Sequence, residues 1–198
     1  TTPKICVKYF AFWLINTYNI CMHITYFVHG TTTDNENNIA TGWLAGELSE
    51  LGIRQSQELG ELVADNKFDA VFCSDLKRAV DSARLAFGNH YNIKQDERLR
   101  EANYGRHNGA NALFEKQLLH YIDLPFPGGE SYRDVEKRVH NFLDEKKQQY
   151  DNKHIALVSH QGPQLAIEVI CHHKTWPQAV QEDWRNAGAW QPGWEYAY

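Results

Sequence analysis

Three short apolar runs along the chain predict the strands of a single sheet. They cover residues 24–28, 68–73 and 155–159, and the second is apolar on both faces, as a buried parallel strand would be. A polar or glycine-containing turn and then a helical pattern follow the runs. Repeated strand–helix units predict an α/β fold, here a three-layer αβα sandwich with a mostly parallel central sheet.

Helical patterns fill much of the chain between these runs. They are expected over residues 48–65, 77–88 and 112–121, after residue 131 and after residue 163. Ser49 is a candidate N-cap of the first helix, and Ser131 with Asp134 makes a capping-box-like start for the fourth. The face of the first helix expected to cover the sheet is apolar and consists of Leu51, Leu59, Leu62 and Val63.

The two ends of the chain differ in character from this repeating part. Residues 5–21 are rich in aromatic side chains and carry lysine as their only charge, whereas Met22, the only methionine, opens a cleaner pattern. We therefore expect residues 1–21 to be a leader or an extension and residues 22–198 to form one domain that starts at Met22. An apolar strap on the surface of the fold is the alternative for residues 1–21. The C-terminal tail is expected to wrap the core with its tryptophans, Trp176, Trp184, Trp190 and Trp194.

Polar side chains stand at the carboxyl ends of the predicted strands. His29 ends the first, Ser74 follows the second, and His160 ends the third. Because these ends meet at one edge of a parallel sheet, where open α/β sheets bind ligands, we expect the side chains to lie close together. Arg78 falls in the first turn of the helix after Ser74, where a cation is mildly unfavourable and a bound anion would explain it.

The segment from residue 98 to residue 109 adds a candidate acid. It packs Arg98, Arg100 and Arg106, the carboxylate Glu101 and two glycines into a dozen positions. A carboxylate held among cations and glycine turns is what a general acid beside a phosphate would look like. A solvated connecting loop is the alternative interpretation.

Charge and cysteine content narrow the class of ligand and the compartment. A formal net charge of −5 argues against general affinity for nucleic acid or an anionic membrane, so an anionic substrate would need a local pocket. The cysteines Cys6, Cys21, Cys73 and Cys171 lie far apart, which predicts free thiols in a reducing, cytoplasmic setting. No metal site is expected, because Cys171 and the two histidines after it are adjacent and adjacent residues rarely converge on one ion.

Seven ordered segments resemble motifs of the histidine phosphatase, or phosphoglycerate mutase-like, superfamily from about Met22 to Ile170. The resemblance implies the αβα fold of that superfamily and phosphoryl transfer on a small phosphorylated metabolite. The matching segments are His29-Gly30 with Thr32 and Asn35, Gly42-Trp43 through Leu48, Leu51-Gly52 with Gln55, Ser74 to Ala79, Glu101 with Gly105 and Gly109, Gly129-Glu130-Ser131, and Val158-Ser159-His160.

Carried over to these positions, the resemblance implies a role for each site residue. His29 would be the nucleophile that takes the phosphoryl group, Arg78 and His160 would hold its oxygens, and Glu101 would protonate the leaving group and then activate water. No cofactor is expected. The residues expected to bind the phosphate or the substrate are Gly30, Thr32, Asn35, Arg78, Arg100, Arg106 and Gln161.

Two positions depart from the pattern of the superfamily. Val28 stands where the family has an arginine before the nucleophile, and Gln161 stands where glycine is common. Loss of a bidentate guanidinium could cost about 2.7–4 kcal/mol of transition-state stabilisation, a factor of roughly 100 to 1,000, unless Arg98, Arg100 or Arg106 takes its place. The sequence favours a phosphomonoester hydrolase impaired by this loss. A phosphoglycerate mutase-type phosphotransferase and a non-catalytic phospholigand-binding protein remain open, as does the oligomeric state, a homodimer included.

Overall fold

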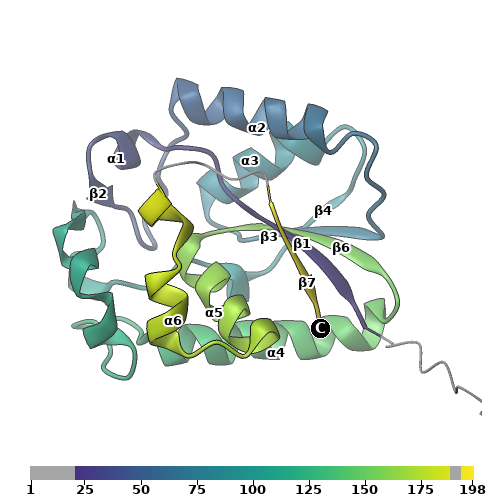
Figure 1. Cartoon of the computed structure of the whole chain (residues 1–198). Helices are drawn as coiled ribbons and strands as arrows, with labels where there is room; N and C mark the ends of the chain where they lie inside the picture. Colours follow the sequence, from purple (N-terminus) through teal and green to yellow (C-terminus); the bar gives the residue numbers. More distant parts are fainter. Residues whose placement is uncertain (1–20, 188–192) are drawn as a thin grey trace, which may run out of the picture.

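The computed structural model describes residues 21–187 and 193–198, in which one five-stranded sheet lies between two layers of helices (Figure 1). The strand order is β4-β3-β6-β1-β7, with β7 antiparallel to β1 and the other neighbours parallel. This confirms the predicted α/β fold with a mostly parallel sheet. The strands are β1 (His23–Val28), β3 (Ala70–Cys73), β4 (Ile93–Gln95), β6 (His154–Ser159) and β7 (Trp194–Ala197).

The helices divide between the two faces of the sheet (Figure 1). One face is covered by α2 (Glu50–Leu62) and α3 (Lys77–Phe87), and the other by α4 (Tyr132–Tyr150) and α5 (Gln161–His172), with α6 (Trp176–Gln181) packed on α5. Shorter elements lie in the segments that connect these strands and helices. They are α1 (Thr33–Glu36), β2 (Ile39–Ala40), β5 (Ala110–Asn111) and the 3₁₀ helices η1 (Glu97–Leu99), η2 (Gly105–His107), η3 (Ala112–Tyr121) and η4 (Trp184–Ala187).

The alternation of side chains along β1 decides which way the site residues point. Tyr26 belongs to the core under α4 and α5, while Phe27 belongs to the core under α2 and α3. Because successive side chains of a strand point to opposite faces, Val28 returns to the α5 side and packs in the same core as Tyr26. His29, the next residue, is then directed toward α3, which carries Arg78.

The capped starts of α2 and α4 are confirmed, and the predicted inner face of α2 is right at Leu59 but wrong at Leu51 and Leu62. Ser49 accepts a hydrogen bond from the Gly52 amide, and Ser131 and Asp134 form a reciprocal capping box. Leu51 and Leu62, however, are 42% and 65% exposed. The buried residues of α2 are Gly52, Ser56 and Leu59.

A close backbone contact explains the small residues on this inner face. A Cβ atom at Gly52 would lie 1.9 Å from the carbonyl oxygen of Thr31, and a Cβ at Gly30 would lie 2.4 Å from the carbonyl oxygen of Gly52. The loop after β1 and the first turn of α2 therefore touch through two glycines. Leu51 and Leu62 turn to the outside of the helix.

The C-terminal tail adds a strand that the sequence pattern did not predict. β7 pairs with β1 at the edge of the sheet, and the backbones of Met22 and Tyr198 exchange two hydrogen bonds of 2.9 and 3.0 Å. Trp176 is buried against the core, as expected. Trp190 and residues 1–20, and with them the leader or extension, lie outside the described residues. Within the described ranges, no helix has the length and apolar character needed to cross a membrane.

Candidate active site

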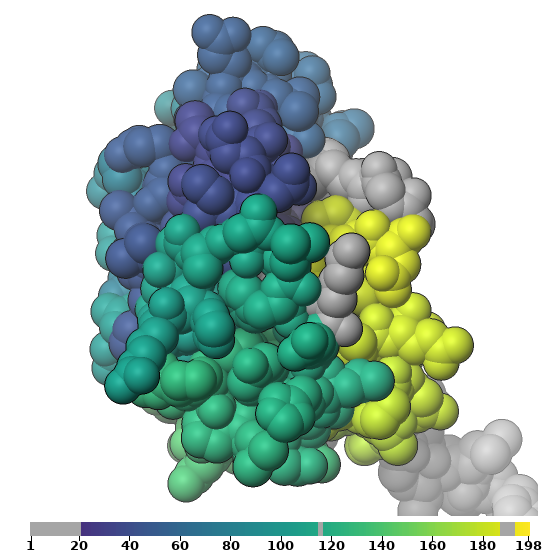
Figure 2. All heavy atoms as spheres, turned by 90° about the vertical axis from the view of Figure 1, so that its left-hand side faces the viewer, coloured from purple at the N-terminus to yellow at the C-terminus, as the bar shows by residue number. Residues whose placement is uncertain are grey.

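A cavity of about 410 Å³ opens at the carboxyl edge of the sheet, where the sequence predicted a site. In Figure 2, which faces this edge, the dark-blue segment after β1, the teal segment around residues 100–125 and the yellow C-terminal segment meet. The pairing of β2 with β5 ties the first two segments together. Five of the predicted site residues line the cavity: His29, Asn35, Arg78, Glu101 and Gln161.

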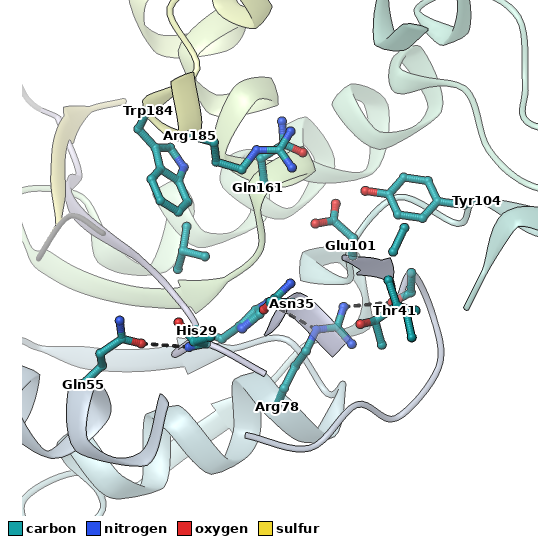
Figure 3. Close-up of a pocket in the computed structure, with 15 residues that line it drawn as sticks. His29, Asn35, Thr41, Gln55, Arg78, Glu101, Tyr104, Gln161, Trp184 and Arg185 are labelled. Carbon is teal, nitrogen blue, oxygen red and sulfur yellow. Dashed lines mark hydrogen bonds between the residues drawn. The ribbon is translucent and has the colours of Figure 1, made fainter. Parts of the chain in front are cut away.

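The hydrogen bonds of His29 leave one ring nitrogen as a base. Its Nδ1 lies 2.7 Å from the carbonyl oxygen of Gly30, and because a carbonyl can only accept, Nδ1 carries the proton. Nε2 then holds a lone pair and accepts a hydrogen bond of 3.2 Å from Nε of Arg78 (Figure 3). Burial and the Arg78 charge lower the pKa of His29 from 6.5 to about 3. The imidazole is therefore neutral and nucleophilic across the physiological pH range.

Arg78 is a fixed cation beside this nitrogen. Its side chain is 2% exposed, and its two terminal nitrogens donate to the carbonyl oxygens of Leu44 and Gly42, at 3.0 and 2.8 Å. These carbonyls belong to the loop after β2, so the loop sets the direction of the guanidinium. A cation held this way costs no reorganisation when negative charge develops next to it.

His160 lies beside His29, with 5.0 Å between the two ring centroids. It is fully buried, and neither of its ring nitrogens has a hydrogen-bond partner. Burial and the charge of Arg78 hold the pKa of His160 well below its usual value. Tyr26 fixes the backbone here, because its hydroxyl donates to the His160 carbonyl at 2.7 Å and accepts from the His160 amide at 3.1 Å. An unpaired neutral imidazole in this place is suited to an oxygen-rich ligand.

Glu101 lies in the loop after η1, and its buried carboxyl group contacts the first turn of α5. It is 7% exposed, and its Oε1 accepts hydrogen bonds from the amides of Ala102 and Gly162 at 2.8 and 2.9 Å. Burial raises the pKa of Glu101 above 4.5, against the opposing effects of the amides and of nearby arginines. A carboxyl group with a raised pKa, facing the same cavity as a nucleophile, has the properties of a general acid.

The loop of residues 98–109, which carries Glu101 and is called the acid loop below, is held in place by Arg138 and Glu130. Arg138 on α4 donates to the carbonyl oxygens of Arg98, Arg100 and Glu101 at 2.7–2.9 Å. Its partner is Glu130, which lies 2.9 Å away and also accepts from the amide of residue 103. This explains the Gly-Glu-Ser segment before α4, because its glutamate links α4 to the backbone around Glu101.

Replacement of Gly162 by alanine should displace the acid. A Cβ atom there would lie 2.4 Å from Oε1 of Glu101, so the carboxyl group must move. Alanine normally favours a helix over glycine by about 0.5–1 kcal/mol, so a harmful effect would be due to this contact and not to helix propensity. We expect Gly162→Ala to lower turnover of alkyl phosphates by on the order of 10- to 100-fold and of aryl phosphates much less. Steady-state kinetics with both ester types, alongside thermal unfolding, checks this, and equal rates for the two enzymes on alkyl phosphates would contradict it.

Several predicted phosphate-binding residues lie away from the cavity. Thr32 is fully buried and caps α1, while Gly30 supports the contact with α2 and donates its amide to Ser82 at 3.0 Å. The predicted substitutes for the missing arginine are also elsewhere. Arg100 forms a two-pronged ion pair with Asp75, and Arg106 is exposed on η2. Local charge density does not tell where a long side chain points, so the sequence alone could not show that these arginines lie away from the cavity.

Arg98 is likewise committed elsewhere. Two of its nitrogens donate to the carboxylate of Asp96 at 2.7 and 2.9 Å, and a third lies 2.8 Å from Glu145. None of the arginines of the 98–109 segment therefore lines the cavity.

Several residues of the cavity wall come from distant segments and were not predicted from the sequence. The tail contributes Trp184 and Arg185, the acid loop contributes Tyr104, and α2 contributes Gln55, which accepts from the Thr31 amide at 2.9 Å. The two residues that depart from the resembled pattern, Val28 and Gln161, line the wall as well. The tryptophan-rich tail was the available signal, but its pattern alone does not distinguish a core cover from a cavity wall.

A neutral histidine with a lone pair on Nε2, a buried arginine and a buried carboxyl group with a raised pKa make this a site for nucleophilic substitution with acid assistance. The chain belongs to the histidine phosphatase superfamily (branch 1), whose sequence profile matches residues 26–189. Phosphatases and mutases both occur among its relatives.

Two curated relatives are bacterial 2,3-bisphosphoglycerate-dependent phosphoglycerate mutases. The chain is 35% identical to that of Rhizobium meliloti over 126 residues, covering 56% of this chain and 60% of the mutase. It is 32% identical to that of Cytophaga hutchinsonii over 167 residues, covering 77% and 78%. The chain thus spans 60% of the length of the first of these enzymes.

Solved structures agree on the fold. The α-ribazole phosphatase of Shigella flexneri superposes with a TM-score of 0.70 at 25% identity, covering 81% of this chain and 84% of the phosphatase. A mycobacterial glucosyl-3-phosphoglycerate phosphatase in complex with VO3 gives a TM-score of 0.69 at 26% identity, covering 82% and 86%.

Proposed function

We propose that the chain is a phosphomonoester hydrolase that works through a phosphohistidine on His29. The observation that carries this proposal is the lone pair on Nε2 of a neutral His29, beside the guanidinium of Arg78 and in the same cavity as the buried acid Glu101. The substrate class is a small phosphorylated metabolite, for which a cavity of about 410 Å³ is large enough. The free thiols of Cys73 and Cys171 support a cytoplasmic location.

In the first half-reaction, Nε2 of His29 attacks phosphorus and the bond from phosphorus to the ester oxygen breaks. Glu101 gives its proton to the departing oxygen. In the second half-reaction, water attacks the phosphohistidine while the Glu101 carboxylate takes the proton, which releases phosphate and restores neutral His29. Arg78 and His160 hold the non-bridging oxygens, and this contact would give the unpaired ring of His160 its partner.

Two alternatives share this site. A phosphoglycerate mutase-type transfer must keep water away from the phosphohistidine, and the short segments around the cavity offer little length for an extra lid. A non-catalytic phospholigand-binding protein is supported by Val28, which lines the cavity without offering a donor. Steady turnover of p-nitrophenyl phosphate by the purified chain supports hydrolysis. Binding of vanadate without turnover would favour the non-catalytic alternative.

Replacement of Glu101 by glutamine should slow poor leaving groups far more than good ones. Alkyl oxygens need a proton as they depart and nitrophenolate does not, so we expect Glu101→Gln to lower kcat/KM for alkyl phosphates by on the order of 10²- to 10⁴-fold and for p-nitrophenyl phosphate much less. Equal slowing of both esters would remove the general-acid role.

The pH dependence of turnover gives a second test of the general-acid role of Glu101. The pKa of Glu101 is raised, so the carboxyl group is protonated below a pKa that lies above 4.5, and turnover of alkyl phosphates should fall as the pH rises through that value. His29, whose pKa is lowered to about 3, should add no acidic limb near pH 6.5. The limb from Glu101 should be absent in Glu101→Gln.

A further inference from the structure

Two cationic side chains reach the cavity from opposite sides. Among the described lining residues, Arg78 and Arg185 are the arginines and no lysine is present. Figure 3 shows Arg78 next to His29, Arg185 next to Gln161 on the facing side, and Glu101 between them. The mechanism above uses Arg78 and assigns nothing to Arg185.

A buried polar pair holds the backbone and side chain of Arg185. Nε and Nη2 of the guanidinium both lie 3.0 Å from Oδ2 of Asp183, and the Arg185 amide donates to Oδ1 of the same carboxylate at 2.9 Å. The same Oδ2 accepts 2.9 Å from Nε2 of Gln161 on α5. Gln161 and Asp183 are 5% and 6% exposed. Arg185, which lines the cavity, is thus fixed through Asp183 to α5, the helix that begins directly after His160.

The contact with Asp183 gives a structural reason for glutamine at position 161. A glycine at this position, common in the resembled pattern, could not bind Asp183, so η4 would lose its side-chain connection to α5. Burying an ionised aspartate is costly unless its partners are well placed. Here four nitrogen atoms of Gln161 and Arg185 contact the Asp183 carboxylate, and these contacts fix Arg185 at the cavity.

Arg185 lies on the side of the acid and not on the side of the nucleophile. Burial raises the pKa of Glu101, and the charges of Arg78 and Arg185 both oppose this rise. The pKa of His29 is lowered by burial and by the charge of Arg78, and Arg185 is not among its causes. In Figure 3, Arg185 lies on the side of the cavity with Gln161 and Glu101, across from His29 and Arg78. A substrate whose phosphorus sits over His29 and whose ester oxygen faces Glu101 would extend its leaving group toward Arg185.

We infer that Arg185 recognises an acidic group on the leaving-group portion of the substrate, and this inference rests on the proposed hydrolase function. The preferred substrates are then phosphomonoesters with a second anion, a carboxylate or another phosphate, a few bonds from the ester oxygen. A planar guanidinium with its direction fixed by Asp183 suits either group, because both accept paired N–H donors. Arg185 determines specificity and does not act on the transferred phosphoryl group.

Three esters of similar length test the inference. The kcat/KM values of 3-phosphoglycerate, which has a carboxylate, and of propane-1,3-diol bisphosphate are compared with that of glycerol 3-phosphate, whose leaving group is uncharged. We expect the wild type to prefer one or both acidic esters, and Arg185→Gln to reduce that preference by on the order of 10- to 100-fold, mainly through KM. The acidic ester whose kcat/KM falls more in Arg185→Gln shows whether Arg185 recognises a carboxylate or a phosphate. Because Glu101 serves all three esters, its effects cancel in the ratio.

Matched variants separate recognition from a general loss of charge or of folding. Arg54→Gln removes the same charge from an exposed site on α2 outside the cavity and should leave the preference unchanged. Gln161→Gly should lower the preference in part, because Arg185 keeps its charge but its anchor is weakened, and Arg185→Lys should restore part of what Arg185→Gln loses. An equal loss on all three esters in Arg185→Gln, or a wild type without preference, overturns the inference.

Binding keeps the test independent of turnover. If the chain hydrolyses none of the esters, the proposed function fails, and isothermal titration of 3-phosphoglycerate and glycerol 3-phosphate still compares the wild type with Arg185→Gln. A selective loss of affinity for 3-phosphoglycerate supports recognition by Arg185, and the same change in Kd for both ligands overturns it.

Discussion

Replacement of His29 by asparagine should abolish turnover of every phosphomonoester. Nε2 of His29 is the group in the cavity that combines a lone pair, a neutral ring and a neighbouring fixed cation. Asparagine keeps a hydrogen-bonding side chain of smaller size but has no comparable nucleophile. In enzymes whose catalytic groups act as a unit, loss of the nucleophile costs on the order of 10⁴-fold or more, and we expect a loss of this size in kcat for p-nitrophenyl phosphate.

The covalent intermediate gives a direct reading of the same prediction. Rapid denaturation during turnover of ³²P-labelled ester should trap phosphate on the peptide that contains residue 29, labile in acid and stable in base. His29→Asn should trap none, while His140→Asn, a replacement on the exposed face of α4, should trap as much as the wild type. Full turnover without label on residue 29 would mean direct attack by water, and the covalent route would be wrong.

The residues of this site that local patterns could locate are those at the ends of regular elements. His29, Arg78 and His160 follow strands whose apolar runs are easy to recognise, and parallel strands bring their carboxyl ends together. Glu101 is different, because its place depends on Arg138, Glu130 and the amide of Gly162. The charge-rich 98–109 segment made Glu101 a candidate acid and the resemblance to a known motif supported it, while the raised pKa of its buried carboxyl group became evident from the fold.

Close contacts and long side chains explain what the sequence could not predict. The inner face of α2 is set by the contact between Gly30 and Gly52, which no periodicity reveals. Arg100 and Arg185 have the same chemistry, yet one is drawn away by Asp75 and the other is held at the cavity by Asp183. The direction of Arg100 depends on a partner distant in sequence, and the direction of Arg185 depends on a turn of the tail. Neither could be known before the tertiary structure.

Introduction of arginine at position 28 should raise activity more than any other single change. Val28 is 7% exposed, lines the cavity and immediately precedes the nucleophile, so a longer side chain there has the cavity to enter. An arginine donates two parallel N–H groups to phosphoryl oxygens in a site with little water. We expect Val28→Arg to increase kcat/KM for p-nitrophenyl phosphate by roughly 100- to 1,000-fold, the range seen when a transition-state donor is lost elsewhere.

Stability measurements separate this gain from a general change in the site. A buried charge without its anion is costly, so Val28→Arg should have a lower Tm than the wild type in buffer and a larger increase in Tm when vanadate is added. Val28→Lys, which supplies charge without the planar fork, should gain less activity, and Val28→Leu, which supplies bulk alone, should gain none. Equal kcat/KM for Val28→Arg and Val28→Leu would show that the missing donor does not limit the reaction. If the wild type is inert and Val28→Arg is active, the natural chain is a phospholigand-binding protein. One guanidinium would then be the single group that its site lacks for catalysis.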